Sequence, residues 1–329
     1  MTEENLKSGT HDFRAFPPAI FLMGPTASGK SSVALEIAKR LPVEIVSVDS
    51  AQVYQHMNIG TAKPDAKSMA AVPHHLIDLI EPNERYSAAQ FVVDALVAMR
   101  GITERNNIPL LVGGTMLYFR ALLEGLSELP SANIGIRTLI ETRAQDVGWP
   151  ELHNELLRLD PVSAERIRPS DTQRIQRALE VCYLTNKPMS EILGKPRQAC
   201  LPFDVLRIAL IPSNREVLHQ RIAQRFEGML ELGLIDEVRA IRGKFRLNDH
   251  SPSMRCVGYR QVSMYLDDQI NLRKMRETAL AATRQLGKRQ LTWLRPMKGV
   301  KEFDCLSEKL SEQVHEHLLE AGLETAIVS

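Results

Sequence analysis

The sequence lacks the features that mark secreted, membrane and zinc-binding proteins. Its cysteines are scattered at Cys182, Cys200, Cys256 and Cys305, and no Cys-x-x-Cys pair occurs. This fits reduced thiols in a cytoplasm and argues against a zinc site. No stretch approaches the roughly 20 apolar residues that cross a bilayer, so we expect no membrane partner. Residues 1–16 lack the apolar centre of a signal peptide, so we expect a disordered start and a cytoplasmic protein.

The chain also lacks a strong net charge. Lysine and arginine number 41 against 40 aspartate and glutamate, which leaves +1. Binding to a nucleic acid would therefore depend on local basic patches. The 329 residues fit one large domain or a domain with an insertion, and nothing in them suggests an obligate dimer. We expect a monomer.

The most informative stretch that is present covers residues 19–31. The apolar run 19–23 is typical of a buried strand, and GPTASGKS at 24–31 fits the phosphate-loop pattern G-x-x-x-x-G-K-[ST]. Glycines let the backbone bring N–H groups up to phosphate oxygens, and Lys30 adds a mobile positive charge. The Ser31 hydroxyl can ligate Mg²⁺. The pattern predicts a polyphosphate site built by Gly24, Pro25, Thr26, Ala27, Ser28, Gly29, Lys30 and Ser31.

A second apolar strand, 43–48, is followed by Asp49 and a polar cluster. In a parallel sheet the strand ends beside the phosphate loop line the active crevice, so we expect Asp49 to face whatever the phosphate carries. A carboxylate there can act as a general base or hold a metal-bound water. A helix cap or a surface acid is the ordinary alternative.

The strand expected at 108–112 ends without an acid. Gly113, Gly114 and Thr115 follow it, whereas P-loop ATPases commonly place carboxylates there to hold Mg²⁺ and to activate water. Glycines allow a ligand to approach closely, and Thr115 offers a hydroxyl. This favours group transfer over ATP hydrolysis.

The overall pattern predicts an α/β fold, in which a P-loop-type parallel sheet is flanked by helices and carries an all-helical insertion domain. Apolar strands disappear over 131–200 and return at 205–211. We therefore expect a core of 17–130 and 201–300, an insertion of 131–200 and a helical tail of 301–329. A helix over 215–242 places Arg225 where it could fold over bound phosphates.

Two further segments are basic. Arg255 and Arg260 flank a glycine turn, and the stretch 283–298 contains five basic residues and Trp293 but no acid. A helix over 172–186 presents Gln173, Arg174 and Arg177 on one surface. Basic residues neutralise backbone phosphates and aromatics stack on unpaired bases, although solvated helix charge is the default interpretation.

Taken together, six segments resemble the tRNA dimethylallyltransferase family over nearly the whole chain. They are GPTASGKS at 24–31, VDSAQVY at 48–54, NIGTAKP at 58–64, VGGTMLY at 112–118, DTQRIQRALE at 171–180 and KRQLTWLR at 288–295. Each motif is weak by itself, but six in this order are highly specific. One stretch departs from the family pattern, because Asn133 to Gly135 stand where an acid usually precedes the arginine, here Arg137.

The resemblance implies transfer of a dimethylallyl group from dimethylallyl diphosphate to N6 of adenosine 37 in the tRNA anticodon loop, with Mg²⁺ as cofactor. The phosphate loop would hold the diphosphate, Asp49 would be the general base, Thr115 would lie near the reacting centre and Arg225 would clamp the diphosphate. The tRNA-binding residues implied are Asp49, Ser50, Ala51, Gln52, Thr115, Arg137, Gln173, Arg174, Ile175, Gln176, Arg177, Arg255, Cys256, Val257, Gly258, Tyr259, Arg260, Lys288, Arg289, Gln290, Leu291, Thr292, Trp293, Leu294 and Arg295. ATP could bind the same loop as a competitor.

Two other functions share some of these features. A small-molecule or nucleotide kinase would also have a phosphate loop, a strand-end acid and arginines over the phosphates, but it leaves the basic helix with Trp293 unexplained. A non-catalytic RNA-binding module explains the basic patches and leaves the phosphate loop and Asp49 without a role.

Overall fold

The computed structural model describes residues 16–127, 129–193, 201–248 and 251–323. The expected disordered start therefore lies outside the described residues up to position 15, and so does Cys200. The chain divides into two units, one of residues 1–121 and 201–329 and the other of residues 122–200. The insertion expected at 131–200 lies inside the second unit.

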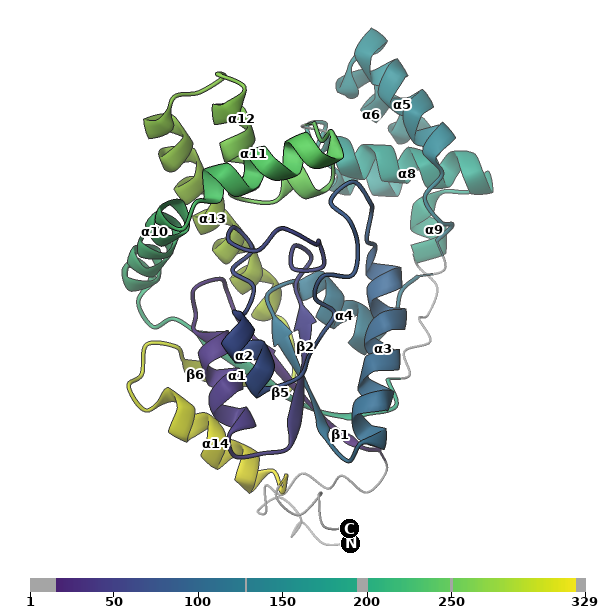
Figure 1. Cartoon of the computed structure of the whole chain (residues 1–329). Coiled ribbons are helices and arrows are strands. Elements are labelled where there is room, and N and C mark those ends of the chain that lie inside the picture. Colours follow the sequence, from purple (N-terminus) through teal and green to yellow (C-terminus); the bar gives the residue numbers. More distant parts are fainter. Residues whose placement is uncertain (1–15, 128, 194–200, 249–250, 324–329) are drawn as a thin grey trace, which may run out of the picture. The chain divides into compact units, whose positions relative to one another are not determined.

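A parallel sheet forms the centre of the first unit (Figure 1). In the described residues its strand order is β3-β2-β4-β1-β5-β6, and every neighbouring pair is parallel. The strands are β1 (Pro18–Met23), β2 (Val43–Val48), β3 (His74–His75), β4 (Ile108–Gly113), β5 (Asp204–Ile211) and β6 (Val300–Asp304). The predicted parallel sheet flanked by helices is confirmed.

The sequence explains why β1 lies in the middle of this sheet. Residues Ala19 to Met23 are fully buried, as expected for a strand covered on both faces by helices. Strand β1 pairs with β4 on one side and with β5 on the other. Chain connections thus run in both directions from β1, and ligands of such sheets bind beyond the carboxyl ends of the strands at this point.

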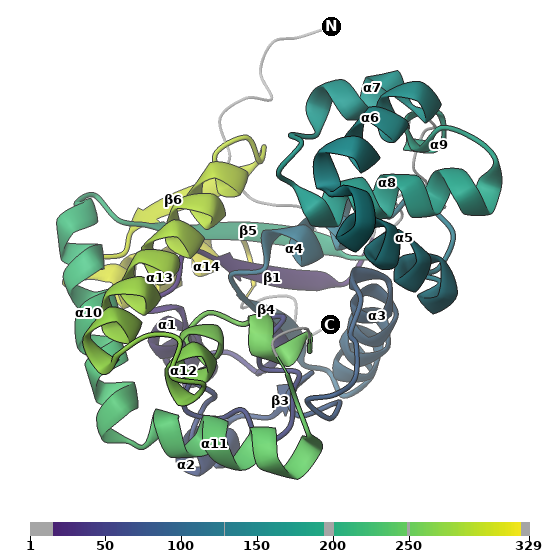
Figure 2. The same cartoon turned by 90° about the horizontal axis from the view of Figure 1, so that it is seen from above.

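Helices of the first unit are α1 (Lys30–Ala38), α2 (Ala66–Ala71), α3 (Ala88–Glu104), α4 (Met116–Glu124, which runs into the second unit), α10 (Arg215–Glu231), α11 (Leu234–Phe245), α12 (Tyr259–Leu266), α13 (Leu272–Leu294) and α14 (Leu310–Glu320), with a 3-10 turn at Ser253–Arg255. Helices α10 to α13 each pack on the next, and α13 also packs on α10. Seen from above, these four helices follow one another around one side of the core (Figure 2).

Two expectations about these helices were wrong. The single helix expected over 215–242 is two helices, because Gly233 adopts a left-handed conformation (φ 95°) between α10 and α11. The tail expected to be helical from 301 begins with β6, whose register pairs Phe303 with Leu210 of β5. The segment 300–304 contains both acidic and basic residues, which is typical of a helix surface, so the sequence did not indicate this strand at the edge of the sheet.

The second unit is all-helical in its described residues. It contains α5 (Ile134–Val147), α6 (Trp149–Leu159), α7 (Pro161–Arg166), α8 (Thr172–Thr185) and α9 (Met189–Leu193). Side chains from α5, α6, α7 and α8 form its core, among them Ile140, Leu152 and Leu179. Residues 194–200 of the predicted insertion lie outside the described residues.

Candidate functional site

The phosphate-loop sequence folds as a turn between β1 and α1. Gly29 has φ 83° and lies directly before the first residue of α1, a conformation that costs glycine little. A Cβ at Gly24 would lie 2.8 Å from the carbonyl oxygen of Leu210, so this residue must be small. The amino end of α1 therefore points its N–H groups and the positive end of its dipole at the loop.

Lys30 folds back over this loop. Its amino nitrogen donates hydrogen bonds to the carbonyl oxygen of Pro25 (2.6 Å) and to the hydroxyl of Ser28 (3.4 Å). Burial and the nearby positive charge of Arg225 lower the pKa of Lys30 to about 8, while Asp49 acts in the opposite direction. A bound anion would restore the preference for the charged ammonium.

Asp49 occupies the turn that follows β2. Its Oδ1 accepts a hydrogen bond from the N–H of Ala51 (2.8 Å), and the N–H of Ser50 donates to the Thr115 hydroxyl (3.1 Å). The second of these bonds joins the ends of β2 and β4. A Cβ at Gly113 would lie 2.1 Å from the carbonyl oxygen of Val48, so only glycine lets the two strand ends come this close.

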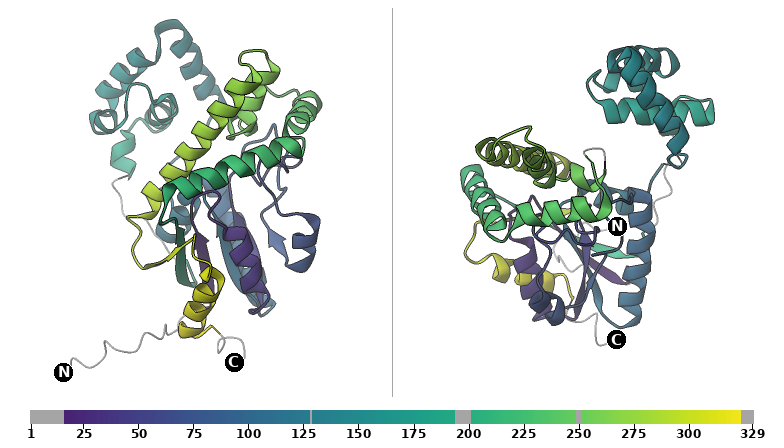
Figure 3. Two further views of the ribbon diagram at one scale, coloured as in Figure 1. Left: turned by 90° about the vertical axis from the view of Figure 1, so that its left-hand side faces the viewer. Right: turned by 45° about the horizontal axis from the view of Figure 1, so that its top comes forward.

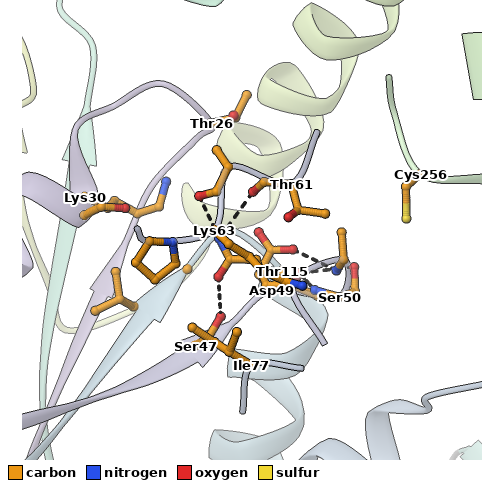
Figure 4. A pocket seen from close by; sticks show the side chains of 18 of the residues that line it. Thr26, Lys30, Ser47, Asp49, Ser50, Thr61, Lys63, Ile77, Thr115 and Cys256 are labelled. Atoms are coloured by element: carbon orange, nitrogen blue, oxygen red, sulfur yellow. Dashed lines mark hydrogen bonds between the residues drawn. The ribbon is translucent and has the colours of Figure 1, made fainter. Parts of the chain in front are cut away.

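Figure 4 shows the resulting arrangement. Asp49, Ser50 and Thr115 form one group, with Lys30 on one side of it and Cys256 on the other. These residues come from four separate segments of the sequence. They share one cavity of about 1070 Å³.

The cavity contains many of the residues singled out from the sequence. Its lining includes Thr26, Lys30, Ser31, Asp49, Ser50, Ala51, Gln52, Thr115, Arg225, Arg255, Cys256, Val257, Tyr259, Arg289, Gln290 and Trp293. Gly24, Pro25 and Ser28 are buried in the loop beneath it. Arg225 is exposed and donates a 3.4 Å hydrogen bond to the Thr26 hydroxyl, which places it over the loop as expected.

Residues 60–64 of the segment 58–64 also line the cavity, although this segment had no predicted role. The Lys63 amino group bonds to the carbonyl oxygen of Tyr54 and to side-chain oxygens of Asn58 and Asp78. Burial lowers the pKa of Lys63, and Asp78 offsets part of that effect. Lys63 therefore ties its loop to Tyr54 and Asp78. The motif NIGTAKP at 58–64 was the sequence feature that could have identified this segment as part of the site.

Gln52 is also used internally. Its Oε1 accepts from the Ser47 hydroxyl (2.8 Å), and its Nε2 donates to the carbonyl oxygens of Thr61 and Ala62 (3.3 Å each). The amide thus holds the Asp49 turn against the 58–64 loop. With both ends of its amide engaged, Gln52 positions its neighbours.

Glu237 of α11 anchors the same loop from the other side. Its carboxylate accepts hydrogen bonds from the N–H groups of Asn58, Ile59 and Gly60 (2.9, 2.8 and 3.2 Å). The hydroxyl of Tyr259 donates to Oε1 as well (2.5 Å). Sequence reasoning missed Glu237, because an acid on a charged helix surface carries no distinguishing pattern.

Of the expected RNA contacts at 255–260, only some are accessible. Arg255 and Arg260 are exposed. Tyr259 is fully buried and Gly258 adopts φ 90° at the start of α12, so both build the turn and cannot touch RNA with a side chain. Cys256 lines the cavity, and burial together with the negative charge of Asp49 raises the pKa of its thiol to about 12.

Helix α13 is a long helix of the first unit and can be followed in both views of Figure 3. Its exposed basic side chains form a basic surface. Lys288, Arg289, Thr292 and Arg295 are exposed, and Trp293 is partly exposed. The guanidinium of Arg120 lies 5.8 Å from the Trp293 ring centroid. Leu291 and Leu294 are buried in the core, which corrects their assignment as RNA contacts. The side chain of Gln290 points toward the phosphate loop and Gly114.

Two of the expected RNA-contacting arginines in the second unit are engaged by a buried carboxylate. Glu180 accepts from Arg137 Nε (2.9 Å), Arg177 Nη1 (2.6 Å) and the N–H of Asn133 (2.7 Å). Although burial opposes ionisation, these bonds hold the pKa of Glu180 below its usual value. Asn133 also accepts from the N–H of Ile136, so it begins α5. Although residues 133–135 depart from the family pattern, the side chain of Arg137 is therefore still held in place by Glu180.

The remaining residues expected to bind RNA in this unit differ in exposure. Gln173 and Arg174 are exposed, and Arg174 lies 3.4 Å from Asp171. Gln176 donates to the side chain of Glu141 (2.9 Å). Ile175 is fully buried and cannot contact RNA.

Within the described residues, no group of three or more His, Cys, Asp or Glu side chains could hold a metal ion. Oxygen atoms that could ligate a metal ion near the phosphate loop include the Ser31 hydroxyl and the Asp49 carboxylate, which share the cavity. The helices found in the described chain include none long and apolar enough to cross a membrane.

Comparisons with known proteins identify the family of this chain. A family model described as IPP transferase matches residues 52–297, and one described as isopentenyl transferase matches residues 18–79. The tRNA dimethylallyltransferase of Nitrosospira multiformis is 67% identical over 96% of this chain and 98% of that protein. That of Nitrosomonas europaea is 63% identical over 91% of this chain and 94% of that protein.

Solved structures give the same result. The tRNA isopentenylpyrophosphate transferase of Bacillus halodurans is 35% identical with a TM-score of 0.68, over 94% of this chain and 97% of that one. A eukaryotic dimethylallyltransferase acting on tRNA is 26% identical with a TM-score of 0.78, over 94% and 80%. Since one family model spans most of the chain and close relatives cover nearly all of it, this protein belongs to the IPP transferase family, as do the tRNA dimethylallyltransferases that it resembles.

Proposed function

We propose that this protein transfers the dimethylallyl group of dimethylallyl diphosphate to N6 of adenosine 37 in tRNA and releases diphosphate. The observation that carries the proposal is the meeting of the phosphate loop with Asp49 in one cavity, on a chain that also presents exposed basic side chains around Trp293. The similar proteins of Nitrosospira multiformis and Nitrosomonas europaea are named tRNA dimethylallyltransferases, which supports the proposal. We expect the protein to act as a monomer.

The reaction divides between two halves of the cavity. The N6 lone pair attacks C1 of the allyl group, the C1–O bond breaks, and its electron pair leaves with the diphosphate. Lys30, Arg225 and the loop N–H groups stabilise the charge that develops on the leaving group. Asp49 accepts the N6 proton, which compensates for the weak nucleophilicity of an aromatic amine.

The part of the cavity beside the phosphate loop has side chains suited to Mg²⁺. The Ser31 hydroxyl lies in the first turn of α1 beside the loop, and Asp49 is the cavity carboxylate that follows β2. Mg²⁺ prefers oxygen ligands and commonly combines one or two protein groups with substrate phosphates and water. When bound, it would neutralise charge on the diphosphate. Ser31 would hold it directly, and Asp49 would do so through water.

The tRNA would bind through exposed cationic side chains. In the first unit these are Arg255, Arg260, Lys288, Arg289 and Arg295, and in the second unit Arg174 is exposed. Such groups neutralise backbone phosphates, and Trp293 can stack on an unpaired base. The target adenosine must leave its stack to enter the cavity, which costs a few kcal/mol and is easiest in a loop such as the anticodon loop.

The test is a transfer assay with labelled dimethylallyl diphosphate, Mg²⁺ and an anticodon stem-loop. We expect label in RNA that has adenosine at position 37 and none when guanosine replaces it. Consumption of ATP with a small acceptor and no label in RNA would instead support the kinase interpretation. If the protein binds RNA but neither labels it nor consumes ATP, the result would support a non-catalytic RNA-binding module.

A further inference from the structure

Gln290 lies on the basic helix α13 but directs its side chain away from the basic surface. Its Oε1 accepts a hydrogen bond from the main-chain N–H of Thr26 (2.9 Å). Its Nε2 donates to the main-chain carbonyl oxygen of Gly114 (3.0 Å). Both polar atoms of the amide are therefore engaged by the backbone of two loops far away in the sequence, and neither is directed at a nucleic acid.

The packing around this amide is tight. A Cβ at Gly114 would lie 2.2 Å from Gln290 Nε2, so the contact requires glycine at 114. One turn earlier on α13, Gly287 is buried, and a Cβ there would lie 3.9 Å from Pro25 Cβ. The helix thus runs directly beside the phosphate loop.

The two loops joined by Gln290 carry the two halves of the proposed chemistry. Thr26 belongs to the phosphate loop, and its hydroxyl accepts a hydrogen bond from Arg225. Gly114 precedes Thr115, whose hydroxyl accepts from the N–H next to Asp49. One amide therefore bridges the loop that would hold the donor and the turn that holds the base.

We propose that Gln290 is a positioning residue that sets the placement of the donor diphosphate relative to Asp49. It acts through Thr26 and Gly114 and does not bind RNA, contrary to the expectation from its motif. This inference rests on the proposed transfer reaction. Reacting groups must lie within a narrow range of separations, so a small shift between the two loops lowers the rate strongly.

The chemistry of the position explains why an amide is required. Thr26 presents a donor and Gly114 an acceptor, so the side chain between them must accept and donate at once. An ionised glutamate keeps the acceptor but places a second oxygen against the Gly114 carbonyl. A protonated glutamate restores the pairing. Q290E is therefore a pH-dependent substitute for glutamine.

The experiment compares Q290A and Q290E with Q285A, a matched control on the same helix whose side chain is exposed. For each variant we measure kcat and KM for dimethylallyl diphosphate, and the Kd for the anticodon stem-loop at fixed salt. Loss of two hydrogen bonds predicts a fall in kcat/KM of the order of 10- to 100-fold for Q290A. We expect RNA Kd to stay within about twofold for every variant, and Q285A to match wild type throughout.

The pH profile separates positioning from a general loss of structure. The activity of Q290E relative to wild type is expected to be low at pH 8 and to rise as the pH falls and the new carboxyl gains a proton, whereas Q290A relative to wild type stays constant. Unchanged kcat/KM in Q290A would overturn the inference, as would a loss of RNA affinity that accounts for the whole defect. Absence of transfer by the wild-type protein would instead refute the proposed function.

Discussion

The amino nitrogen of Lys30 lies 2.6 Å from the carbonyl oxygen of Pro25, within the loop that we propose to hold diphosphate. The ammonium is thus satisfied by its own loop when no anion is bound. Burial, followed by the charge of Arg225, lowers its pKa to about 8. The charged ammonium binds diphosphate more tightly than the neutral amine, so this pKa contributes to the pH dependence of donor affinity.

We predict that Lys30 takes up a proton when diphosphate binds at alkaline pH. Below about pH 8 the free lysine is already charged and no uptake is needed. Above it the free lysine is neutral, so each further pH unit weakens binding by about tenfold. Calorimetry of inorganic diphosphate binding in buffers of different ionisation enthalpy measures the uptake.

Lys30→Arg is the control for that experiment. Diphosphate itself titrates in this range, and the variant shares this background, but arginine cannot lose its proton in a protein. The difference in proton uptake between wild type and variant is expected to rise from near zero at pH 6.5 towards about one proton at pH 9. Equal uptake by the two proteins would show that Lys30 does not titrate on binding.

Asp49→Asn is predicted to slow transfer strongly while the turn after β2 stays folded. The Asn Oδ1 can still accept from Ala51, so the turn keeps its hydrogen bond. Loss of general-base catalysis is expected to lower the single-turnover rate by about 10²- to 10⁴-fold. Kd values for diphosphate and stem-loop serve as the readout of folding and binding. Asp268→Asn, at an exposed position, should leave the rate unchanged, and near-normal transfer by Asp49→Asn would exclude Asp49 as the base.

Glu237→Ala is predicted to destabilise the protein far more than Asp236→Ala. Glu237 supplies the acceptor for three main-chain N–H groups and the Tyr259 hydroxyl, and leaving such groups unpaired predicts a loss of about 2–4 kcal/mol. Asp236 makes an exposed pair with Arg239 of the kind that contributes below about 1 kcal/mol. Urea denaturation of the two variants measures the contrast, and equal stability losses would contradict the role assigned to Glu237.

Arg174 and Arg177, one helical turn apart on α8, should respond differently to alanine. Arg174 is exposed, so its loss is predicted to weaken stem-loop binding and reduce the salt slope by about one, with little change in Tm. Arg177 bonds to buried Glu180, so its loss is predicted to reduce stability by roughly 1–3 kcal/mol. Salt-dependent binding and thermal unfolding distinguish the two roles, and interchanged results would refute the assignment.

The parallel sheet and its phosphate loop were predictable because their signals are local. A buried strand reads as a continuous apolar run, and the loop has fixed glycine, lysine and serine positions, so β1 and the start of α1 follow directly from residues 18–31. Strand β6 was missed because an edge strand is only partly buried, and its sequence VKEFD has the mixed charges of a helix surface.

The orientation of single side chains within the motifs could not be predicted. The motif at 288–295 contains exposed, buried and inward-pointing residues, and only packing separates Arg289 from Gln290 and Leu291. Gln52 and Tyr259 carry polar groups that could face a ligand, but the main-chain carbonyl of Thr61 engages the first and the carboxylate of Glu237 engages the second. Such pairings depend on how loops and helices pack, which the sequence does not display.

The most direct test of the whole account follows both products of one turnover. A single-turnover reaction of wild-type protein with dimethylallyl diphosphate and the adenosine-37 stem-loop is analysed for released diphosphate and for modified nucleoside. The account predicts one diphosphate for each N6-dimethylallyladenosine formed, and neither product at a comparable rate with Asp49→Asn. Release of diphosphate without modified RNA, or modification that continues unchanged in Asp49→Asn, would contradict it.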